Sequence, residues 1–310
     1  METVERAERG TESSGGQMSL SVVVPAFNEE KAVGAEVATL RSVLEKTGWP
    51  FEIIVVDDGS TDRTGDAAES AGARVVRHWV NRGYGAALKT GIRVAKGNII
   101  GITDADGTYP PDALPRLVSM LVEGQHDMVV GARVGPQAQI PLLRRPAKWA
   151  LARLAELIAG EPIPDLNSGQ RVFSRKSVLR FFSLLPDGFS FTTTITLAML
   201  SNGHRVAYEP VSYAKRVGRS KFHPMRDTLG ITGLILRIAL YFAPLKIFLP
   251  LSVLLILVAL AWGLVSKFVL GSLADVSTVL LVLAAAQVAG VGLVAELINR
   301  RVTNPFQADE

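Results

Sequence analysis

The sequence lacks cysteine altogether, which excludes disulfides, thiolate metal sites and cysteine nucleophiles. Histidine is scarce, and the four residues in this 310-residue chain show no spacing typical of a metal site. The formal net charge is only +4, and the basic residues form no long tract of the kind that binds nucleic acid. Redox chemistry therefore has no protein thiol in this chain, and nucleic acid is not the expected partner.

Hydrophobic residues are abundant at 48%, yet charged residues still make up 20% of the chain. This balance favours a soluble domain joined to a membrane part over a fully embedded protein. Residues 1–18 are polar and rich in Gly and Ser, without an apolar stretch, so we expect a flexible tail there.

The apolar excess lies near the C-terminus, at residues 247–265 and 276–298. Each run has about 20 residues with almost no charge, which is enough to cross a bilayer, so we predict two transmembrane helices. Residues 226–246 mix apolar and basic side chains and predict an interfacial amphipathic helix. A pair of buried core helices is the alternative interpretation of the two apolar runs.

Basic residues gather just before the first predicted span and just after the second, whereas the short connection carries one lysine. Cytoplasmic segments of membrane proteins are enriched in Lys and Arg. We therefore expect a multi-pass membrane protein with two spans, with the catalytic domain and both termini in the cytoplasm. Residues 299–310 would form a cytoplasmic tail.

Between residues 19 and 225 the sequence alternates between apolar, β-branched runs and stretches with helical spacing. We predict strands at 21–25, 51–56, 74–77, 99–103, 127–131, 172–173 and 206–211, and helices at 32–46, 61–70, 84–95, 111–123, 144–158 and 190–201. This alternation predicts an α/β fold with a parallel sheet covered on both faces. Ligands of such sheets bind at the carboxyl ends of the strands.

Two carboxylates, Asp104 and Asp106, follow the fourth predicted strand. Side chains two apart in an extended segment share a face, so the pair could hold Mg²⁺ or Mn²⁺ against a diphosphate. The cation would act as a Lewis acid on the leaving group. A helix cap or a turn is the alternative role of such a pair.

Asp57 and Asp58 follow the second predicted strand in the same way, and either recognise a base or ribose or merely cap the next helix. The glycine-rich segment 81–91, with Gly83 and Lys89, is suited to backbone contact with a phosphate at a helix start. Arg133 and Arg171 are candidate anion contacts, since guanidinium groups bind phosphate oxygens in bidentate fashion.

The order of these pieces resembles the family 2 glycosyltransferases, and among them the polyprenyl-phosphate sugar synthases of the dolichol-phosphate mannose synthase type. The matching blocks are residues 21–30, 55–62, 81–85, 104–106, 131–133, 167–171 and 218–221. The resemblance covers about residues 19 to 222. It implies a GT-A fold, which is a Rossmann-like nucleotide-sugar-binding domain, and an inverting mechanism.

The resemblance also implies roles for single residues. In the nucleotide pocket it implies contacts from Pro25, Phe27 and Glu29, with Asp57 or Asp58 at the base, Asp104 positioning the donor and Asp106 as the principal metal ligand. Several relatives have a glutamine two places after the last of these acids, where this chain has Thr108, so the third protein ligand is left open.

On the acceptor side, Arg133 and Arg171 resemble arginines that hold the acceptor phosphate, while Ser220 and Lys221 resemble a loop that closes over the donor diphosphate. A lipid phosphate is already an anion, so no strong general base is needed. Asp165 is the carboxylate with a candidate auxiliary role.

The sequence thus predicts the transfer of a single sugar, glucose or mannose, from a UDP- or GDP-sugar to dolichyl or undecaprenyl phosphate. One alternative is another lipid acceptor, such as diacylglycerol or a sterol, whose hydroxyl would need a general base. Another is a non-catalytic, nucleotide-binding membrane scaffold. A processive polysaccharide synthase is disfavoured because its Gln-x-x-Arg-Trp motif does not occur. The predicted hairpin could also pack against copies of itself as a homo-oligomer.

Overall fold

The fold is taken from a computed structural model of the whole chain. The residues that the structure describes are 18–134, 153, 155–157, 159–188, 190–214, 240, 243–269, 271 and 275–303. The predicted tail at 1–18 lies outside them except for Met18, and so does nearly all of the predicted amphipathic helix at 226–246. Those two predictions stay predictions.

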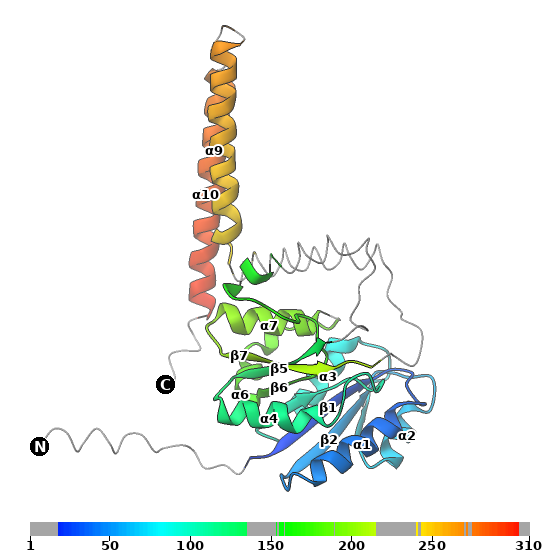
Figure 1. Cartoon of the computed structure of the whole chain (residues 1–310). Helices are drawn as coiled ribbons and strands as arrows, with labels where there is room; N and C mark the ends of the chain where they lie inside the picture. Colours follow the sequence, from blue (N-terminus) through cyan, green and yellow to red (C-terminus); the bar gives the residue numbers. More distant parts are fainter. Residues whose placement is uncertain are drawn as a thin grey trace, which may run out of the picture.

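The soluble part is built on one seven-stranded sheet with the strand order β3-β2-β1-β4-β6-β5-β7 (Figure 1). The strands are β1 (Leu20–Ala26), β2 (Phe51–Asp57), β3 (Arg74–Arg77), β4 (Ile99–Ile102), β5 (Met128–Val134), β6 (Arg171–Ser174) and β7 (Val206–Ser212). All seven were expected from the sequence, within a few residues at each end.

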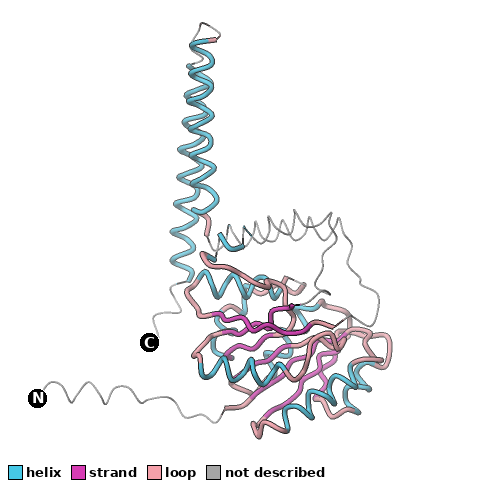
Figure 2. The backbone as a smooth tube through the Cα atoms, in the orientation of Figure 1, coloured by secondary structure: helices cyan, strands magenta, loops and turns pink. Residues whose placement is uncertain are grey.

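The helices of this domain lie on both faces of the sheet, as expected (Figure 2). They are α1 (Val33–Glu45), α2 (Thr64–Ser70), α3 (Tyr84–Val94), α4 (Ala113–Glu123), α6 (Arg175–Arg180), the 3-10 turn η4 (Phe182–Leu184) and α7 (Phe191–Ser201). Buried side chains of α1, α2 and α4 pack on one face, and those of α3, α6 and α7 pack on the other. Of the predicted helix at 144–158, residues 153 and 155–157 are described, and they are helical.

Alternation along the central strands explains why the sheet needs two helical layers. In β1, Val22 and Val24 belong to the core under α1 and α4, whereas Val23 belongs to the core under α3. In β2, Ile53 and Ile54 divide in the same way. Successive strand residues point to opposite faces, so these continuous apolar runs bury both faces of the sheet.

The expectation of a purely parallel sheet was wrong at one strand. β6 runs antiparallel between β4 and β5, whereas the other neighbouring pairs are parallel. A short strand of two apolar residues carries no signal for its direction, because direction is set by the pairing partners and not by local propensity. The reversal has a functional consequence, since the loop before β6 reaches the carboxyl ends of its two neighbours.

The two predicted spans are long helices, α9 (Leu245–Phe268) and α10 (Asp275–Thr303), which lie side by side and extend away from the sheet domain (Figure 1). Between them, Ser252 Oγ donates to the carbonyl of Ala285 at 2.8 Å. A Cβ at Gly292 would come within 2.6 Å of Phe248 Cβ, so the small residue permits close packing of the pair.

Most of the hairpin surface is apolar and exposed, which a soluble core helix would not be. Residues 245–268 and 276–298 have mean hydropathies of 2.6 and 2.2, and only 11% of either apolar window is buried. An exposed apolar surface of this size requires lipid or a protein partner. The described residues therefore include two helices capable of crossing a membrane, and they are not core helices of the sheet domain. At the base of the hairpin, Lys246 Nζ donates to the carbonyl of Leu157 at 2.8 Å.

Candidate active site

The topology gathers the candidate residues at one edge of the sheet. Arg171, the first residue of β6, is paired with Ile102 near the end of β4 and with Val130 in β5. The loop 165–170 that precedes β6 therefore lies beside the residues that follow β4 and close to the last residues of β5. This edge brings Asp104, Asp106, Arg133 and Asp165 into one region, as the ligand-binding rule for such sheets predicts.

The carboxylates of Asp104 and Asp106 each accept a hydrogen bond from a hydroxyl group. Tyr84 donates its hydroxyl to Asp104 Oδ1 at 3.0 Å, and Thr108 donates its hydroxyl to Asp106 Oδ1 at 2.6 Å. The backbone of Gly169 lies so close that an added Cβ would stand 2.6 Å from Asp104 Oδ2. Thr108 therefore orients Asp106. Its hydroxyl is engaged in this contact, so it is a poor substitute for the glutamine that the resembled family has at this position.

A third carboxylate, Glu36, lies behind this pair and was missed by the sequence interpretation. It is 95% buried in the first turn of α1, where apolar residues would be expected. Burial, together with the negative charges of Asp106 and Asp104, raises the pKa of Glu36 to about 7. The signal was available, because Glu36 falls on the inward stripe of α1 that Val33 and Val37 define.

The carboxylate oxygens at this edge fit a hard divalent cation whose remaining coordination positions are filled by water or phosphate. Carboxylate oxygens are the protein ligands preferred by Mg²⁺, and an Mg²⁺ site keeps several positions for water and phosphate. Glu36 Oε1 is buried without any hydrogen-bond partner among the described residues. No three acidic or histidine side chains in the described part of the chain converge closely enough to enclose an ion. Any cation here would therefore depend on ligands beyond these side chains.

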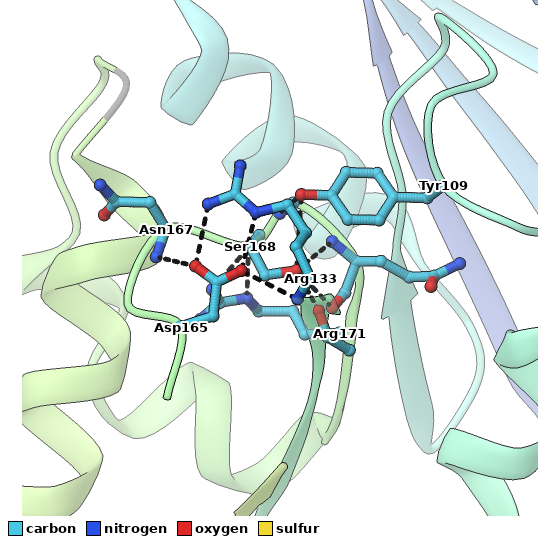
Figure 3. Close-up of polar contacts among 9 residues, drawn as sticks. Tyr109, Arg133, Asp165, Asn167, Ser168 and Arg171 are labelled. Atoms are coloured by element: carbon cyan, nitrogen blue, oxygen red, sulfur yellow. Dashed lines mark hydrogen bonds and ion pairs between the residues drawn. The ribbon is translucent and has the colours of Figure 1, made fainter. Parts of the chain in front are cut away.

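Farther along the same edge, Arg133 at the end of β5 and Asp165 in the loop before β6 form a bidentate ion pair (Figure 3). Arg133 donates through Nε to Asp165 Oδ2 at 2.7 Å and through Nη2 to Oδ1 at 2.8 Å. The backbone amides of Arg133 and Asn167 also donate to the same carboxylate. Despite burial, the hydrogen bonds and charge of Arg133 hold the pKa of Asp165 below its usual value.

The ion pair orients the Arg133 guanidinium and uses two of its three nitrogen atoms, Nε and Nη2. Its guanidinium lies 5.4 Å from the ring centroid of Tyr213, and its Nη1 has no hydrogen-bond partner among the described residues. Because both oxygens of Asp165 accept hydrogen bonds and its pKa is low, the carboxylate is a poor proton acceptor. The geometry makes it the residue that orients Arg133.

A small network joins the two sides of the site through the loop 165–170. The amide of Gly169 donates to the hydroxyl of Tyr109 at 2.7 Å, and Ser168 Oγ donates to the carbonyl of Gly131. The rings of Tyr109 and Tyr213 meet edge to face at 5.2 Å. Gly169 touches Asp104 on one side while Ser168 contacts β5 on the other, so one loop sets the spacing between both sides.

Arg171 has a different environment from the one expected. Its side chain is fully buried, and its guanidinium donates to the carbonyls of Ser168 and Thr192 and to the hydroxyl of Thr196. Burial lowers the pKa of this arginine. These contacts join the loop before β6 to α7. They argue against direct contact of Arg171 with an acceptor phosphate, because burial leaves the guanidinium no exposed surface.

The expected nucleotide residues lie at the ends of β1 and β2. Pro25 is buried, Phe27 and Glu29 are half-buried, and the amide of Glu29 donates to Thr64 Oγ1 at 2.8 Å. Asp57 accepts from the amide of Ser60 through Oδ1 at 3.0 Å. The segments that follow the two strands are thus joined to each other at this end of the sheet.

Asp58 is used inside the protein. Its carboxylate accepts from His78 Nδ1 at 2.7 Å and from the backbone amides of Arg82 and Gly83 at 2.9 and 2.8 Å. The next residue, Gly59, has a φ of 73°, and an added Cβ would stand 2.5 Å from the carbonyl carbon of Val80. Asp58 therefore holds the loop 78–83, which makes Asp57 the better candidate for a nucleotide contact.

The glycine-rich segment before α3 receives another part of the chain. A Cβ at Gly83 would stand 2.6 Å from the carbonyl oxygen of Asp187, and the amide of Ala86 donates to that oxygen at 3.0 Å. Lys89 donates to the carbonyl of Leu185 at 3.0 Å and forms an ion pair with Asp187. In this arrangement the glycine-rich segment packs against the loop 185–188. Ser220 and Lys221 lie outside the described residues.

Comparison with protein families identifies the class of this fold and site. Residues 21–182 match the model of glycosyl transferase family 2, and residues 243–300 match the GtrB C-terminal hairpin. The chain therefore belongs to glycosyltransferase family 2 and is an enzyme of that kind. The match confirms the family and the C-terminal hairpin that the sequence predicted.

Among curated relatives, the dolichyl-phosphate hexose transferase of Haloferax volcanii is 32% identical over 71% of this chain and 94% of its own length. The dodecaprenyl-phosphate galacturonate synthase of Rhizobium johnstonii is 29% identical over 97% of this chain and 93% of its own. The undecaprenyl-phosphate 4-deoxy-4-formamido-L-arabinose transferase of Edwardsiella ictaluri is 30% identical over 91% of this chain and 89% of its own.

Among solved structures, the glucosyl-3-phosphoglycerate synthase of Mycobacterium tuberculosis, in complex with Mn²⁺ and UDP, superposes with a TM-score of 0.58 at 24% identity. The match covers 76% of this chain and 80% of that one. The mannosyl-3-phosphoglycerate synthase of Rubrobacter xylanophilus gives 0.55 at 21% identity, over 71% and 72% of the two chains. These similarities confirm the GT-A fold.

Proposed function

We propose that this protein transfers a single sugar from a nucleotide-sugar to a polyprenyl phosphate. The observation that carries the proposal is the oriented Arg133, which lies at the carboxyl edge of the sheet near Asp104 and keeps its Nη1 group for another anion. The names of the relatives support it, because they include transferases to dolichyl, dodecaprenyl and undecaprenyl phosphate. We propose glucose or mannose as the sugar and UDP or GDP as the carrier.

The reaction needs two anions to be held on opposite sides of one sugar carbon. A phosphate oxygen of the lipid attacks the anomeric carbon, the bond to the diphosphate breaks, and the nucleoside diphosphate leaves with inversion. Arg133 would bind the attacking phosphate, and Asp165 would keep its guanidinium in that orientation. No residue has to remove a proton, because the attacking group is already an anion.

On the donor side, Asp104 and Asp106 would hold Mg²⁺ or Mn²⁺. The cation would supply Lewis-acid stabilisation of the charge on the leaving diphosphate. The Mn²⁺ and UDP in the complex of a protein with the same fold support this proposal for the donor side. Phe27, Glu29 and Asp57 would contact the nucleoside at the ends of β1 and β2, and Ser220 with Lys221 would cover the diphosphate.

The membrane hairpin supports the choice of acceptor. A polyprenyl phosphate keeps its tail in the bilayer and its headgroup at the interface, so an enzyme anchored by α9 and α10 meets it there. We propose a domain at 19–225, an interfacial helix at 226–246 and the hairpin at 247–298, with the catalytic domain and both termini in the cytoplasm. A pairing of hairpins into a homo-oligomer would be compatible with this arrangement.

The deciding experiment is transfer by the purified full chain in detergent. A panel of radiolabelled UDP- and GDP-sugars is offered with undecaprenyl or dolichyl phosphate, with Mg²⁺ or Mn²⁺ or with chelator. A lipid-linked product that needs the cation supports the proposal and names the sugar. If a folded preparation glycosylates diacylglycerol or a sterol and no lipid phosphate, the acceptor is wrong. If it binds nucleotide but transfers nothing, the scaffold alternative holds.

The membrane topology has its own test, which the absence of native cysteine makes simple. Single cysteines are introduced at Glu123 at the end of α4 and at Lys267 at the far end of α9. In intact cells, a membrane-impermeant maleimide should label Lys267→Cys and spare Glu123→Cys. The reverse pattern would contradict the proposed orientation.

A further inference from the structure

We propose that Glu36 is a positioning carboxylate of the donor site, which strengthens divalent-cation binding by adding a third negative charge behind Asp104 and Asp106. The inference rests on the cation use proposed above and goes beyond it, because neither the resemblance nor the motif Asp104-Ala-Asp106 points to a residue on α1. The role is electrostatic, since no three acids in the described residues enclose an ion.

Packing brings Glu36 under the turn that carries the two aspartates. Ala105, which stands between them, is 3% exposed and packs in the same core cluster as Val33 and Val37 of α1. Glu36 Oε2 lies 3.9 Å from the position that a Cβ of Gly107 would take. The Glu36 carboxylate in the first turn of α1 therefore lies against the segment 104–108. Gly107 has no side chain that would separate the two.

Glu36 has no structural reason to be an acid. Its Oε1 is buried and has no hydrogen-bond partner among the described residues, and no basic side chain there forms an ion pair with it. A buried carboxylate without a partner is destabilising, and two further acids beside it add repulsion. A leucine or glutamine at this position would give a more stable α1. A cation bound by the aspartates would instead be attracted to all three charges.

The charge at Glu36 also matters because Thr108 stands where several relatives have a glutamine. The Thr108 hydroxyl is used by Asp106 Oδ1, and the residue is only 1% exposed, so it adds no charge and little ligand capacity at the third position of the motif. A carboxylate behind the turn increases the negative potential at the cation without needing to reach it. Removal of second-layer partners of metal ligands typically weakens metal binding by about 10- to 100-fold.

The test measures the binding of Mn²⁺ itself, apart from transfer. Mn²⁺ is titrated into the full chain in detergent, and free Mn²⁺ is read by electron paramagnetic resonance for wild type, Glu36→Gln, Glu36→Asp and a control, Glu45→Gln. Glu45 lies at the other end of α1 and is exposed. We expect Glu36→Gln to bind Mn²⁺ at least about tenfold more weakly, or 1.4 kcal/mol, with the control unchanged and Glu36→Asp in between.

A thermal melt provides the second readout and separates charge from structure. Without cation, Glu36→Gln should melt at a higher temperature than wild type, because a buried unpartnered charge is gone. With Mn²⁺, the rise in Tm should be smaller for Glu36→Gln than for wild type. A purely structural Glu36 would change the first value and leave the Mn²⁺ affinity unaltered.

The outcomes distinguish this inference from the function on which it rests. Equal Mn²⁺ affinity of wild type and Glu36→Gln overturns the role of Glu36 and leaves the proposed reaction standing. If wild type binds no Mn²⁺ and transfers sugar in chelator, the cation proposal fails and this inference fails with it. If Glu36→Gln does not fold, Glu36→Leu takes its place, because leucine also removes the charge, and equal Mn²⁺ affinity of Glu36→Leu and wild type overturns the role of Glu36.

Discussion

Two groups of carboxylates lie at the same edge of the sheet and differ in how their charge is compensated. Asp165, before β6, accepts two hydrogen bonds from the Arg133 guanidinium and two from backbone amides. Glu36, under the end of β4, has an oxygen without a partner, and the neighbouring aspartates raise its pKa. The charge of Asp165 is neutralised within the protein, whereas no partner among the described residues compensates that of Glu36.

The difference in charge compensation indicates which ligand each part of the site is suited to bind. A bidentate pair with one guanidinium nitrogen left over can accept a second anion with little reorganisation, as a phosphate site requires. A buried carboxylate such as Glu36, with an oxygen that has no partner among the described residues, gains most from a nearby cation. The same edge can therefore bind an anionic lipid headgroup and a cation-diphosphate side by side, with the loop 165–170 between them.

The largest effect should come from the acidic side. Asp106→Ala should reduce transfer by about a thousandfold, or about 4 kcal/mol, because the cation's stabilisation of the leaving diphosphate would be lost. Membrane insertion should be intact, because Asp106 lies far along the chain from the hairpin at 245–303. Initial rates and the amount of protein in the membrane fraction check the two parts. Unchanged transfer would remove the metal assignment.

The next largest effect concerns stability and tests the buried arginine. Arg171→Met should lower the free energy of unfolding of the soluble domain by about 3 kcal/mol, because two buried carbonyls and one hydroxyl each lose a charged donor. Denaturant titration measures it. Arg116→Met, at an exposed ion pair with Glu209, is the matched control and should cost clearly less. If Arg171→Met is stable but binds lipid phosphate poorly, the acceptor role expected from the resemblance would be restored.

The sequence predicted every strand of the sheet and the two membrane helices because those signals are local. An apolar run bounded by Pro, Gly or acids is sufficient to identify β1, β2 and β4, and two uncharged runs are sufficient for the hairpin. The direction of β6 was missed, since it depends on pairing with strands about 70 and 40 residues away in sequence. The position of loop 165–170 was missed for the same reason.

Residue roles were harder to predict than elements, because contacts inside the fold cannot be read from the sequence. Asp58, Lys89 and Arg171 carry the right chemistry for nucleotide or phosphate contacts, but inside the fold their groups bind the loop 78–83, the loop 185–188 and α7. A sequence shows which donors and acceptors exist and not which of them other parts of the chain already occupy. Glu36 differs from these three residues. Its position on the inward stripe of α1 predicted a buried side chain, whereas its charge predicted an exposed one.

A pH titration sharpens the comparison from the acidic side. The pKa of Glu36 is raised from 4.5 to about 7, so the folded protein binds this proton more tightly than the unfolded chain. Stability from this group is therefore complete below about pH 4.5 and is lost as the pH rises toward 7, by about 2 to 3 kcal/mol. Denaturation of wild type and Glu36→Gln in chelator over that range measures it. Parallel curves for the two proteins would contradict the assignment.

The smallest expected effect tests whether Asp165 acts through Arg133 or on a proton. Asp165→Asn should lower kcat/KM for the lipid phosphate by about tenfold, or about 1.4 kcal/mol, chiefly through KM, because Arg133 loses its orienting charge. Arg133→Ala should lower kcat/KM at least as much, and the double variant should be no worse than Arg133→Ala alone, since both changes disable the same ion pair.

A general base at Asp165 would behave differently. Its loss should lower kcat by about 10²- to 10⁴-fold, add to the effect of Arg133→Ala and change the pH profile of kcat. Initial rates at varied lipid phosphate and pH distinguish the two, and additive losses would show that Asp165 handles a proton after all.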